Sequence, residues 1–503
     1  MPLFPRPSVL RCLALPAIAA GALLLAACDG EKVEYDSDRY EIEWTRINGG
    51  AGPVTGLTAA GTYGTLGVAD PANRPGARNG AVSWTDKDGT FWLFGGIGYD
   101  VTGTSGRLND LWKLEAGGWK WVAGANTAEG AATYGTQGAA SALNTPGGRS
   151  QAVGWADDDG VLWLFGGNGL DAADNLGRLG DLWKFDPAAG QWTWVDGSDL
   201  VEQPGVYGTK GTADPANQPG ARHAAAGWID TAGLLWLFGG QGRAAGSSCC
   251  WLNDLWKYDP ATGQWTWVKG SDTANAAAVY ATAAAVADDP ATTTVDESRP
   301  EIVAADLTPG GRYGIAAWHT PDPLPDDGTP SEYAWVFGGT GNDAGGDRVV
   351  FNELWRFNGT DWLFAHGAQG KFSGGHYGGR GFFSFNNDPP GRHRPVAWQT
   401  GSTLWLYGGA VDALDDEQDL PVYPNDLWRW DSIGWTWVGG SNDIEADAAG
   451  KYPADLGGRG LPAGREGGVG WTDSTGGLWL FSGVAEGDLT GSSVFDDIWL
   501  QQP

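Results

Sequence analysis

The chain has 503 residues, including 83 glycines and 30 tryptophans, and it carries a formal net charge of −30. Glycine exceeds twice its ordinary share of about 7%, and flat aromatic residues favour strands, so the composition argues against a helical bundle. With 42% hydrophobic and 18% charged residues, the chain is too apolar to be disordered. A surface this acidic repels phosphate backbones, which argues against nucleic acid as a partner.

The N-terminal segment has the pattern of an export signal. Arg6 and Arg11 precede an apolar run that ends at Ala27 and is too short for a comfortable membrane span. The last residues of this run, Leu25-Ala26-Ala27-Cys28, resemble the lipobox of bacterial lipoproteins. The alternative is a plain secretory signal followed by an incidental cysteine.

The lipobox resemblance implies three further expectations. Residues 1–27 are a signal peptide that is removed, and Cys28 becomes the lipid-bearing first residue. Residues 28–40 are acidic and polar and form a short solvated tether. The protein is then held at a membrane of the bacterial cell envelope, in the periplasm or at the surface.

Two adjacent cysteines remain after Cys28, namely Cys249 and Cys250. In an oxidising compartment they form either a vicinal disulfide, which stiffens one loop, or two free thiols. Their spacing does not match a thioredoxin-like redox centre, which needs two residues between the cysteines.

Four landmarks recur in a fixed order, mostly about 70 to 75 residues apart. An arginine after Pro or Gly comes first, and an aromatic-Gly-Gly end, an Asn-Asp-Leu-Trp motif and a Trp-x-Trp-Val motif follow it. All tryptophans except Trp251 and Trp430 fall on repeat positions, which indicates packing residues. A tyrosine also recurs before each arginine, and we expect it to anchor its loop. The six arginines are Arg78, Arg149, Arg222, Arg312, Arg392 and Arg465.

Each repeat contains four short strand-like segments separated by Asp/Gly turns. In the first repeat the pattern predicts strands at 78–84, 91–94, 110–114 and 119–122. The double glycine and the aromatic residue of the third strand resemble the Kelch motif. The resemblance covers all six repeats and implies an all-β, six-bladed Kelch-type β-propeller of the galactose oxidase-like class, with four antiparallel strands per blade.

The sixth repeat stops after its third strand, at Asp497-Ile498-Trp499. A strand-like segment, Glu41-Ile42-Glu43-Trp44-Thr45, precedes the first repeat. We therefore expect the N-terminal strand, residues 41–47, to complete blade six near Asp497–Leu500. It would close the ring of a single propeller domain spanning 41–503 and hide two sheet edges.

The loops that join strand B to C and strand D to the next strand A are long, and they lie on the same face of a propeller. Long loops cost little to close and commonly carry function. This face is therefore the predicted binding face. The residue after each arginine varies and lies near the predicted channel mouth, so six positions are candidate ligand-binding residues: Asn79, Ser150, His223, Tyr313, His393 and Glu466.

Two interpretations apply to the six arginines. They form a positive ring that binds an anion, or each is buried with one acid of the strand C motif. The acids follow at a similar offset, and the regular repetition favours the structural interpretation. The acids are Asp110, Asp181, Asp254, Glu353, Asp426 and Asp497.

Two classes of function remain open. The first is a monomeric scaffold that binds a protein or a glycan, with no catalytic residue, cofactor or metal. The second is a carbohydrate-active enzyme, similar to the six-bladed Kelch sialic-acid epimerases or to an oxidase. Copper radical oxidases need a cysteine-crosslinked tyrosine, a second tyrosine and two histidines. No cysteine lies on a repeat strand, so that chemistry is disfavoured.

Overall fold

The computed structural model describes residues 43–50, 52–54, 58–246, 250–280, 307–321, 332–343, 345–370, 374–411, 421–431, 433–443, 450–485 and 494–502. The predicted signal peptide (1–27), the tether (28–40), Cys28 and Cys249 lie outside these residues. No α-helix occurs in the described ranges, and no helix among them is long and apolar enough to cross a membrane.

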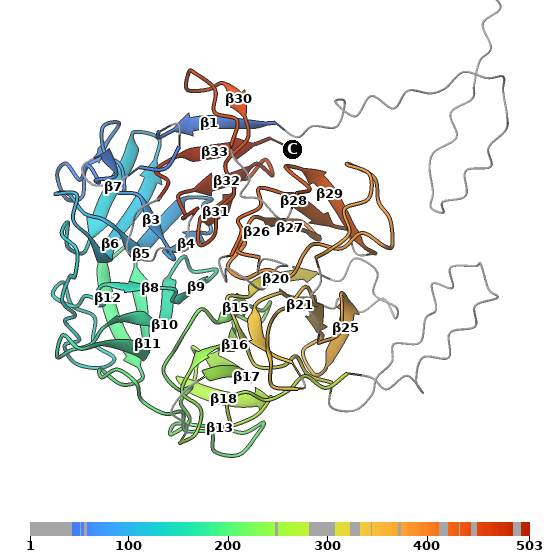
Figure 1. Cartoon of the computed structure of the whole chain (residues 1–503). Coiled ribbons are helices and arrows are strands. Elements are labelled where there is room, and N and C mark those ends of the chain that lie inside the picture. The colour runs from blue at the N-terminus through green and yellow to red at the C-terminus, as the bar shows by residue number, and fades with distance from the viewer. Residues whose placement is uncertain are drawn as a thin grey trace, which may run out of the picture. The chain divides into compact units, whose positions relative to one another are not determined.

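The first three repeats form antiparallel sheets of consecutive strands (Figure 1). In the first repeat the order across the sheet is β4–β5–β6–β7, while β3 pairs with the far end of β5 and β2 pairs with β7. The first repeat contains β2 (Ala69–Asp70), β3 (Arg78–Asn79), β4 (Val82–Thr85), β5 (Phe91–Tyr99), β6 (Ser105–Glu115) and β7 (Gly118–Ala123). The second contains β8 (Arg149–Ser150), β9 (Val153–Ala156), β10 (Leu162–Leu170), β11 (Leu176–Asp186) and β12 (Gln191–Asp196). The third contains β13 (Ala213–Asp214), β14 (Arg222–His223), β15 (Ala226–Ile229), β16 (Leu235–Gly242), β17 (Cys250–Asp259) and β18 (Gln264–Lys269).

The last three repeats follow the same plan with shorter strands. The fourth divides into two sheets, β19–β22–β23 and β20–β21–β24–β25. It contains β19 (Arg312–Tyr313), β20 (Ala316–Pro321), β21 (Glu332–Phe337), β22 (Thr340–Asn342), β23 (Arg348–Val350), β24 (Leu354–Phe357) and β25 (Trp362–His366). The fifth contains β26 (Val396–Thr400), β27 (Thr403–Tyr407), β28 (Leu427–Trp430) and β29 (Trp435–Gly439). The sixth contains β30 (Arg459–Gly460), β31 (Val469–Thr472), β32 (Leu478–Phe481) and β33 (Ile498–Gln501).

The predicted first strand, 78–84, is in fact two strands, β3 and β4. Between them Gly80 adopts a left-handed conformation with φ of 60°, so the strand cannot run straight through. The second and third strands are longer than predicted, because β5 and β6 continue pairing beyond the double glycine. A register shift between Phe94 and Gly96 accommodates those glycines.

The strand β1 (Trp44–Asn48) lies next to the last strand of the chain. It pairs antiparallel with β33, and Trp44 lies opposite Gln501. Its other edge pairs with β30, so the sheet order is β30–β1–β33–β32–β31. The predicted partner segment near Asp497–Leu500 is the observed one, while residues 41 and 42 lie outside the described ranges.

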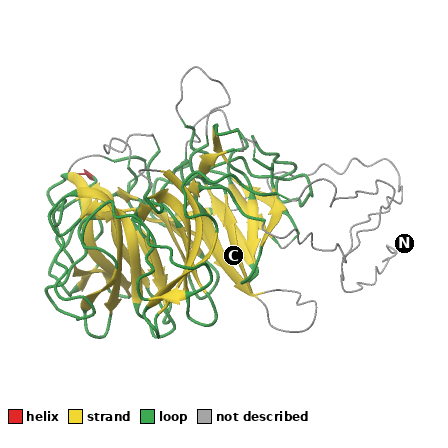
Figure 2. Cartoon of the chain, turned by 90° about the horizontal axis from the view of Figure 1, so that it is seen from below, coloured by secondary structure: helices red, strands yellow, loops and turns green. Residues whose placement is uncertain are grey.

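The inner strands of successive repeats contact one another. Each inner strand contacts the inner strand of the next repeat, and the last contacts the first. In order these strands are β4, β9, β15, β20, β26 and β31. Figure 2 shows the strands side-on, with loops at both of their ends. On the inner side, one residue per repeat donates its backbone N–H to the carbonyl of its counterpart in the preceding repeat, and Gly80 donates to Gly467. In the described ranges this cycle of hydrogen bonds links Gly80, Gln151, Ala224, Gly314, Arg394 and Gly467, all with φ between 50° and 70°.

Tryptophans fill the space between neighbouring sheets. The indole N–H of Trp84 donates to the carbonyl of Trp163 in the next repeat at 3.2 Å, and Trp155 donates to Trp236 at 3.1 Å. Trp471 makes the same contact with Trp92 at 3.0 Å, although the two residues lie in the last and first repeats. Tryptophan is therefore a packing residue here, as the regular repeat positions predict.

Candidate functional site

Each repeat arginine is buried against one acid of its own repeat. Arg78 is 1% exposed, and its two terminal nitrogens donate to the two carboxylate oxygens of Asp110, both at 2.8 Å. Its Nε donates to the carbonyl of Gly76 at 2.9 Å. These guanidinium groups are therefore not available to an anion in the channel. The equivalent pairs are Arg149–Asp181, Arg222–Asp254, Arg312–Glu353, Arg392–Asp426 and Arg465–Asp497.

The recurring tyrosine completes this buried network. The Tyr63 hydroxyl and the Trp112 indole N–H both donate to Oδ2 of Asp110, each at 2.7 Å. Burial raises the pKa of Tyr63 far above its usual value, and the nearby Asp110 charge raises it further. The predicted anchoring role of the tyrosines is confirmed by the same bond in Tyr134, Tyr207, Tyr377 and Tyr452.

The six variable positions lie directly after the buried arginines, next to the cycle of backbone hydrogen bonds. Asn79, Ser150, His393 and Glu466 are almost fully buried, with exposed fractions of 2%, 3%, 5% and 2%. The other two, His223 and Tyr313, are half-buried. Contacts link four of the six into one cluster, which consists of His223, Tyr313, His393 and Glu466.

A buried His–Glu–Arg group lies at one end of this cluster. His393 Nε2 lies 3.4 Å from Glu466 Oε2, and its Nδ1 lies 3.2 Å from the Thr340 hydroxyl. Glu466 also binds Arg394. Burial lowers the pKa of His393 to about 3, and the charges of Arg394 and Arg348 contribute in the same direction. Burial raises the pKa of Glu466, while Arg394 opposes this rise.

Tyr313 connects this group to a half-exposed aromatic surface. Its ring lies 6.0 Å from His393 and 6.5 Å from His223. The indole of Trp251 runs parallel to the Tyr313 ring, with 6.5 Å between centroids and 5° between planes. Within the described residues, Trp251 Nε1 and His223 Nδ1 have no hydrogen-bond partner. Cys250 is the first residue of β17 beside Trp251, but its predicted partner Cys249 lies outside the described ranges.

Arg178 and Glu202 lie near His223, because their charges shift the pKa of that histidine in opposite directions. Arg178 and Arg243 both bind Glu202, with contacts of 2.8 and 2.9 Å. Burial lowers the pKa of His223 to about 4, and the charges of Arg178 and Arg394 add to this effect. The cluster therefore combines aromatic faces, a neutral imidazole and arginines in a protein with a net charge of −30. We call Trp251, Tyr313, His223 and Arg178 the aromatic site.

The predicted positions include only part of this arrangement. Trp251 and Arg178 come from the third strands of their repeats, and the pattern of variable positions did not point to them. One sequence signal did exist, because Trp251 is one of two tryptophans outside the repeat pattern. Among the described residues, no three His, Cys, Asp or Glu side chains are grouped so that they could hold a metal ion.

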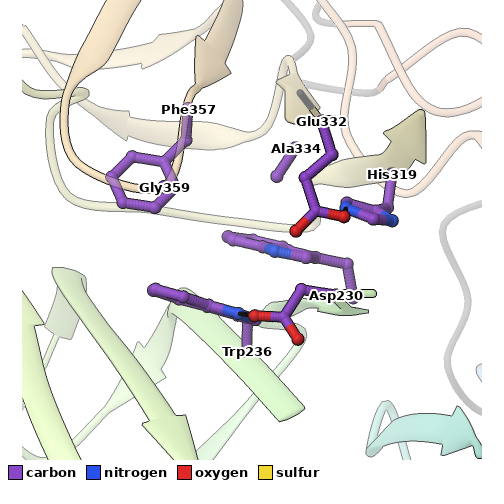
Figure 3. A pocket seen from close by; sticks show the side chains of 8 residues that line it. Asp230, Trp236, His319, Glu332, Ala334, Phe357 and Gly359 are labelled. Carbon is purple, nitrogen blue, oxygen red and sulfur yellow. Dashed lines mark hydrogen bonds and ion pairs between the residues drawn. The ribbon is translucent and has the colours of Figure 1, made fainter. Parts of the chain in front are cut away.

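No Asp, Glu, Lys or Arg among the described residues lines the channel between the inner strands. A cavity of about 450 Å³ lies between the six inner strands, and small residues such as Gly154, Gly227 and Gly470 line it. A second, water-sized pocket of about 20 Å³ lies between the third and fourth repeats (Figure 3). There Trp236 donates to Asp230 at 2.7 Å, and His319 lies 3.1 Å from Glu332. This pocket holds at most a water molecule.

Comparison with known proteins finds one matching motif and two partial similarities. Residues 231–267 match the Kelch motif. A xyloglucanase from Paenibacillus sp is 25% identical over 199 residues, which is 39% of this chain and 16% of the length of the xyloglucanase. A solved structure described as the structure of YjhT aligns with a TM-score of 0.47 and 16% identity, covering 84% of this chain and 95% of that one. The matched motif and the repeated antiparallel sheets identify the described part of the chain as a Kelch-repeat propeller.

Proposed function

We propose that the protein is a six-bladed propeller, closed by residues 41–47, that acts as a monomeric binding protein of the bacterial cell envelope. Closure is supported by the pairing of β1 with β33 and by the hydrogen bond from Gly80 to Gly467. The lipobox pattern supports attachment through a lipid on Cys28. In this arrangement the long B–C and D–A loops form the ligand-binding face.

The ligand that the site fits best is a glycan, bound at the aromatic site. The observation that carries this proposal is the half-buried, parallel pair of Trp251 and Tyr313 beside His223. Aromatic faces bind the apolar faces of sugar rings, while guanidinium and imidazole N–H groups bind hydroxyl or carboxylate oxygens. A repeated structural role does not explain Trp251, because the other repeats lack it.

A glycan array with the lipid-free protein tests the proposal. We expect a restricted set of glycans to bind, and Trp251→Ala to weaken binding at least about tenfold, the loss expected for one anchoring aromatic ring. Val101→Ala is the control, since Val101 is 39% exposed in a B–C loop on the same face. If Trp251→Ala binds as the wild type does, the aromatic site is not the binding site.

A carbohydrate-active enzyme is the second candidate. It is favoured by the His393–Glu466 pair, in which a histidine with a lowered pKa faces a carboxyl with a raised pKa. Opposed shifts of this kind are typical of acid–base groups. The partial similarity to a xyloglucanase supports a carbohydrate as the substrate of this candidate enzyme. Release of reducing ends from xyloglucan by the wild type, and its loss in Glu466→Gln, would favour this candidate over a binding protein.

A further inference from the structure

We propose that the exposed phenylalanines of residues 382–385 rest against the surface of a lipid bilayer. The proposal rests on the lipid attachment at Cys28 proposed above. It assigns this chain a second membrane contact, made by the folded propeller itself. We call Phe382, Phe383, Phe385 and Ile433 the rim patch.

The rim patch is the densest group of exposed large apolar side chains in the described residues. The exposed fractions are 49% for Phe382, 40% for Phe383, 62% for Phe385 and 63% for Ile433. The rings of Phe383 and Phe385 contact each other, with 4.9 Å between centroids. Phe383 lies over Gly434, where any side chain would collide with its ring. The patch is therefore ordered and outward-facing.

The fold does not require phenylalanine at these positions. The loop is held by the N–H of Gly381, which donates to the carbonyl of Trp437 on the outer strand β29. The same bond recurs in three other repeats, from Gly67 to Trp121, Gly138 to Trp194 and Gly211 to Trp267. The residues that follow those glycines are Val68, Ala139 and Thr212, so the equivalent loops pack without an aromatic side chain.

The start of β1, in the sheet of the sixth repeat, packs against the repeat that carries the rim patch. Trp44, the first residue of β1, packs against Trp398 and Tyr407 of the fifth repeat, with centroids 6.0 and 5.7 Å apart. The antiparallel register places Trp44 opposite Gln501, at the end of β33 where the chain also finishes. The described part of β1 therefore begins beside the sheet against which the rim patch packs.

A bilayer fits this patch better than a second copy of the chain. The net charge of −30 makes two copies repel each other, whereas a neutral lipid surface carries no such penalty. A single lipid chain gives only marginal and reversible membrane binding, so a second apolar contact made by the propeller adds retention.

The test uses the chain from Asp29 onward, made without lipid, which keeps every described residue. Binding to phosphatidylcholine vesicles is measured by co-sedimentation for the wild type and for the double variant F382S/F385S. We expect the wild type to bind, and the double variant to bind with an affinity at least about tenfold lower. The reason is that each half-exposed ring contributes part of the transfer free energy of a phenylalanine. Leu143→Ser is the matched control, since Leu143 is 79% exposed in the equivalent loop of the second repeat.

Two results would overturn the proposal. One is equal vesicle binding by the wild type and F382S/F385S, with unchanged melting temperatures. The other is a wild type that sediments as a dimer and a double variant that sediments as a monomer, which would make the patch an interface between copies. Because the assay protein carries no lipid, failure of the Cys28 attachment leaves the vesicle result unaffected, and labelling of Cys28 tests that attachment separately.

Discussion

Arg149 binds Asp181 with two parallel hydrogen bonds, at 2.7 and 2.9 Å, and both side chains are completely buried. Asp181 also accepts hydrogen bonds from Tyr134 and Trp183, both at 2.7 Å. One buried ion pair thus connects the loop that contains Tyr134, the strand β8 and the third strand, β11, of the same repeat. The equivalent networks elsewhere explain why arginine, tyrosine and Asn-Asp-Leu-Trp recur together in the sequence.

Removal of this arginine should destabilise the fold without touching the ligand site. Arg149→Ala leaves Asp181 as a buried carboxylate without its cation, a change that typically costs about 3–5 kcal/mol. We expect the free energy of unfolding to fall by that amount in chemical denaturation. Glycan affinity of the folded fraction should stay the same, because the guanidinium does not reach the aromatic site.

Arg149→Lys separates charge from geometry in the same experiment. Lysine retains the positive charge but cannot form two parallel bonds to the carboxylate. We expect an intermediate loss of stability. A thermally silent Arg149→Ala with weakened binding of anionic ligands would instead support an anion-binding ring.

The double glycine of each repeat has a steric cause. In Gly166 φ is 65°, and a Cβ there would lie 2.7 Å from the carbonyl oxygen of Arg222 in the next repeat. Gly166→Ala should therefore lower stability by at least about 1–2 kcal/mol, which thermal unfolding can measure. Gly190→Ala is the control, because it has a similar φ of 67° but nothing lies within 4 Å of its Cβ position. Equal losses in both variants would show that backbone strain, not packing, explains the motif.

Ser482 is the one exception to that glycine, and it lies between the last and first repeats. Its hydroxyl donates to the carbonyl of Arg78 at 2.6 Å and accepts from the Arg78 N–H at 2.7 Å. The Ser482 side chain thus forms hydrogen bonds with the backbone of Arg78. An alanine methyl group at the same position would only crowd that backbone. The other five repeats have glycine at this position, but the sequence alone did not indicate that the serine links the last repeat to the first.

The repeat pattern was sufficient to predict the strand order, the pairing of β1 and the buried arginines, because each depends on a residue type that recurs. The repeat pattern was not sufficient to predict the cycle of backbone hydrogen bonds on the inner side of the repeats. Only three of the six residues with positive φ are glycines, while the others are Gln151, Ala224 and Arg394. Tertiary contacts impose the left-handed conformation at those three positions, so local sequence carries no signal for it. Arg178 was missed because it lies on the third strand of its repeat and not directly after a repeat arginine, whereas the only signal for Trp251 was its place outside the repeat pattern.

Loss of the N-terminal strand should open the ring. Deletion of residues 41–47 removes Trp44, which is 1% exposed, and leaves one edge of β33 unpaired. We expect a loss of at least about 3–5 kcal/mol, the range for deleting a buried tryptophan side chain, together with a tendency to aggregate through the exposed edge. Deletion of residues 30–40 is the matched control and should leave the melting temperature unchanged. A similar melting temperature for both deletions would contradict closure by this strand.

Lipid attachment is tested by metabolic labelling. Cells that express the full chain are grown with a labelled fatty acid, and the wild type should incorporate it. Cys28→Ala should not incorporate it, because the thiol is the only acceptor in the lipobox pattern. Cys12→Ala is the control and should be labelled normally, since Cys12 lies in the segment that is removed. Label in the Cys28→Ala protein would contradict the lipoprotein interpretation.

The buried histidines should make stability depend on pH. The pKa of His393 is lowered from 6.5 to about 3 in the folded protein, so between these values the unfolded chain binds a proton that the folded chain does not. Stability therefore rises with pH across this window and is lost as the pH falls below about 6.5, by up to ~1.4 kcal/mol per pH unit for each such histidine. His223, whose pKa falls to about 4, adds to the same slope, while the raised pKa of Glu466 acts in the opposite direction.

His393→Gln isolates this contribution, because glutamine does not titrate while Arg348, Arg394 and Glu466 still face the position. The measurement is the free energy of unfolding of both proteins at intervals from pH 7 to pH 5. We expect the variant to be less stable at pH 7, where the imidazole contacts with Thr340 and Glu466 are lost. Its curve should nevertheless be flatter than that of the wild type below pH 6.5, so the two curves converge as the medium becomes acidic. Parallel curves would mean that the pKa of His393 is the same in the folded and unfolded chains, in which case the opposed pKa shifts behind the acid–base interpretation of the site do not exist.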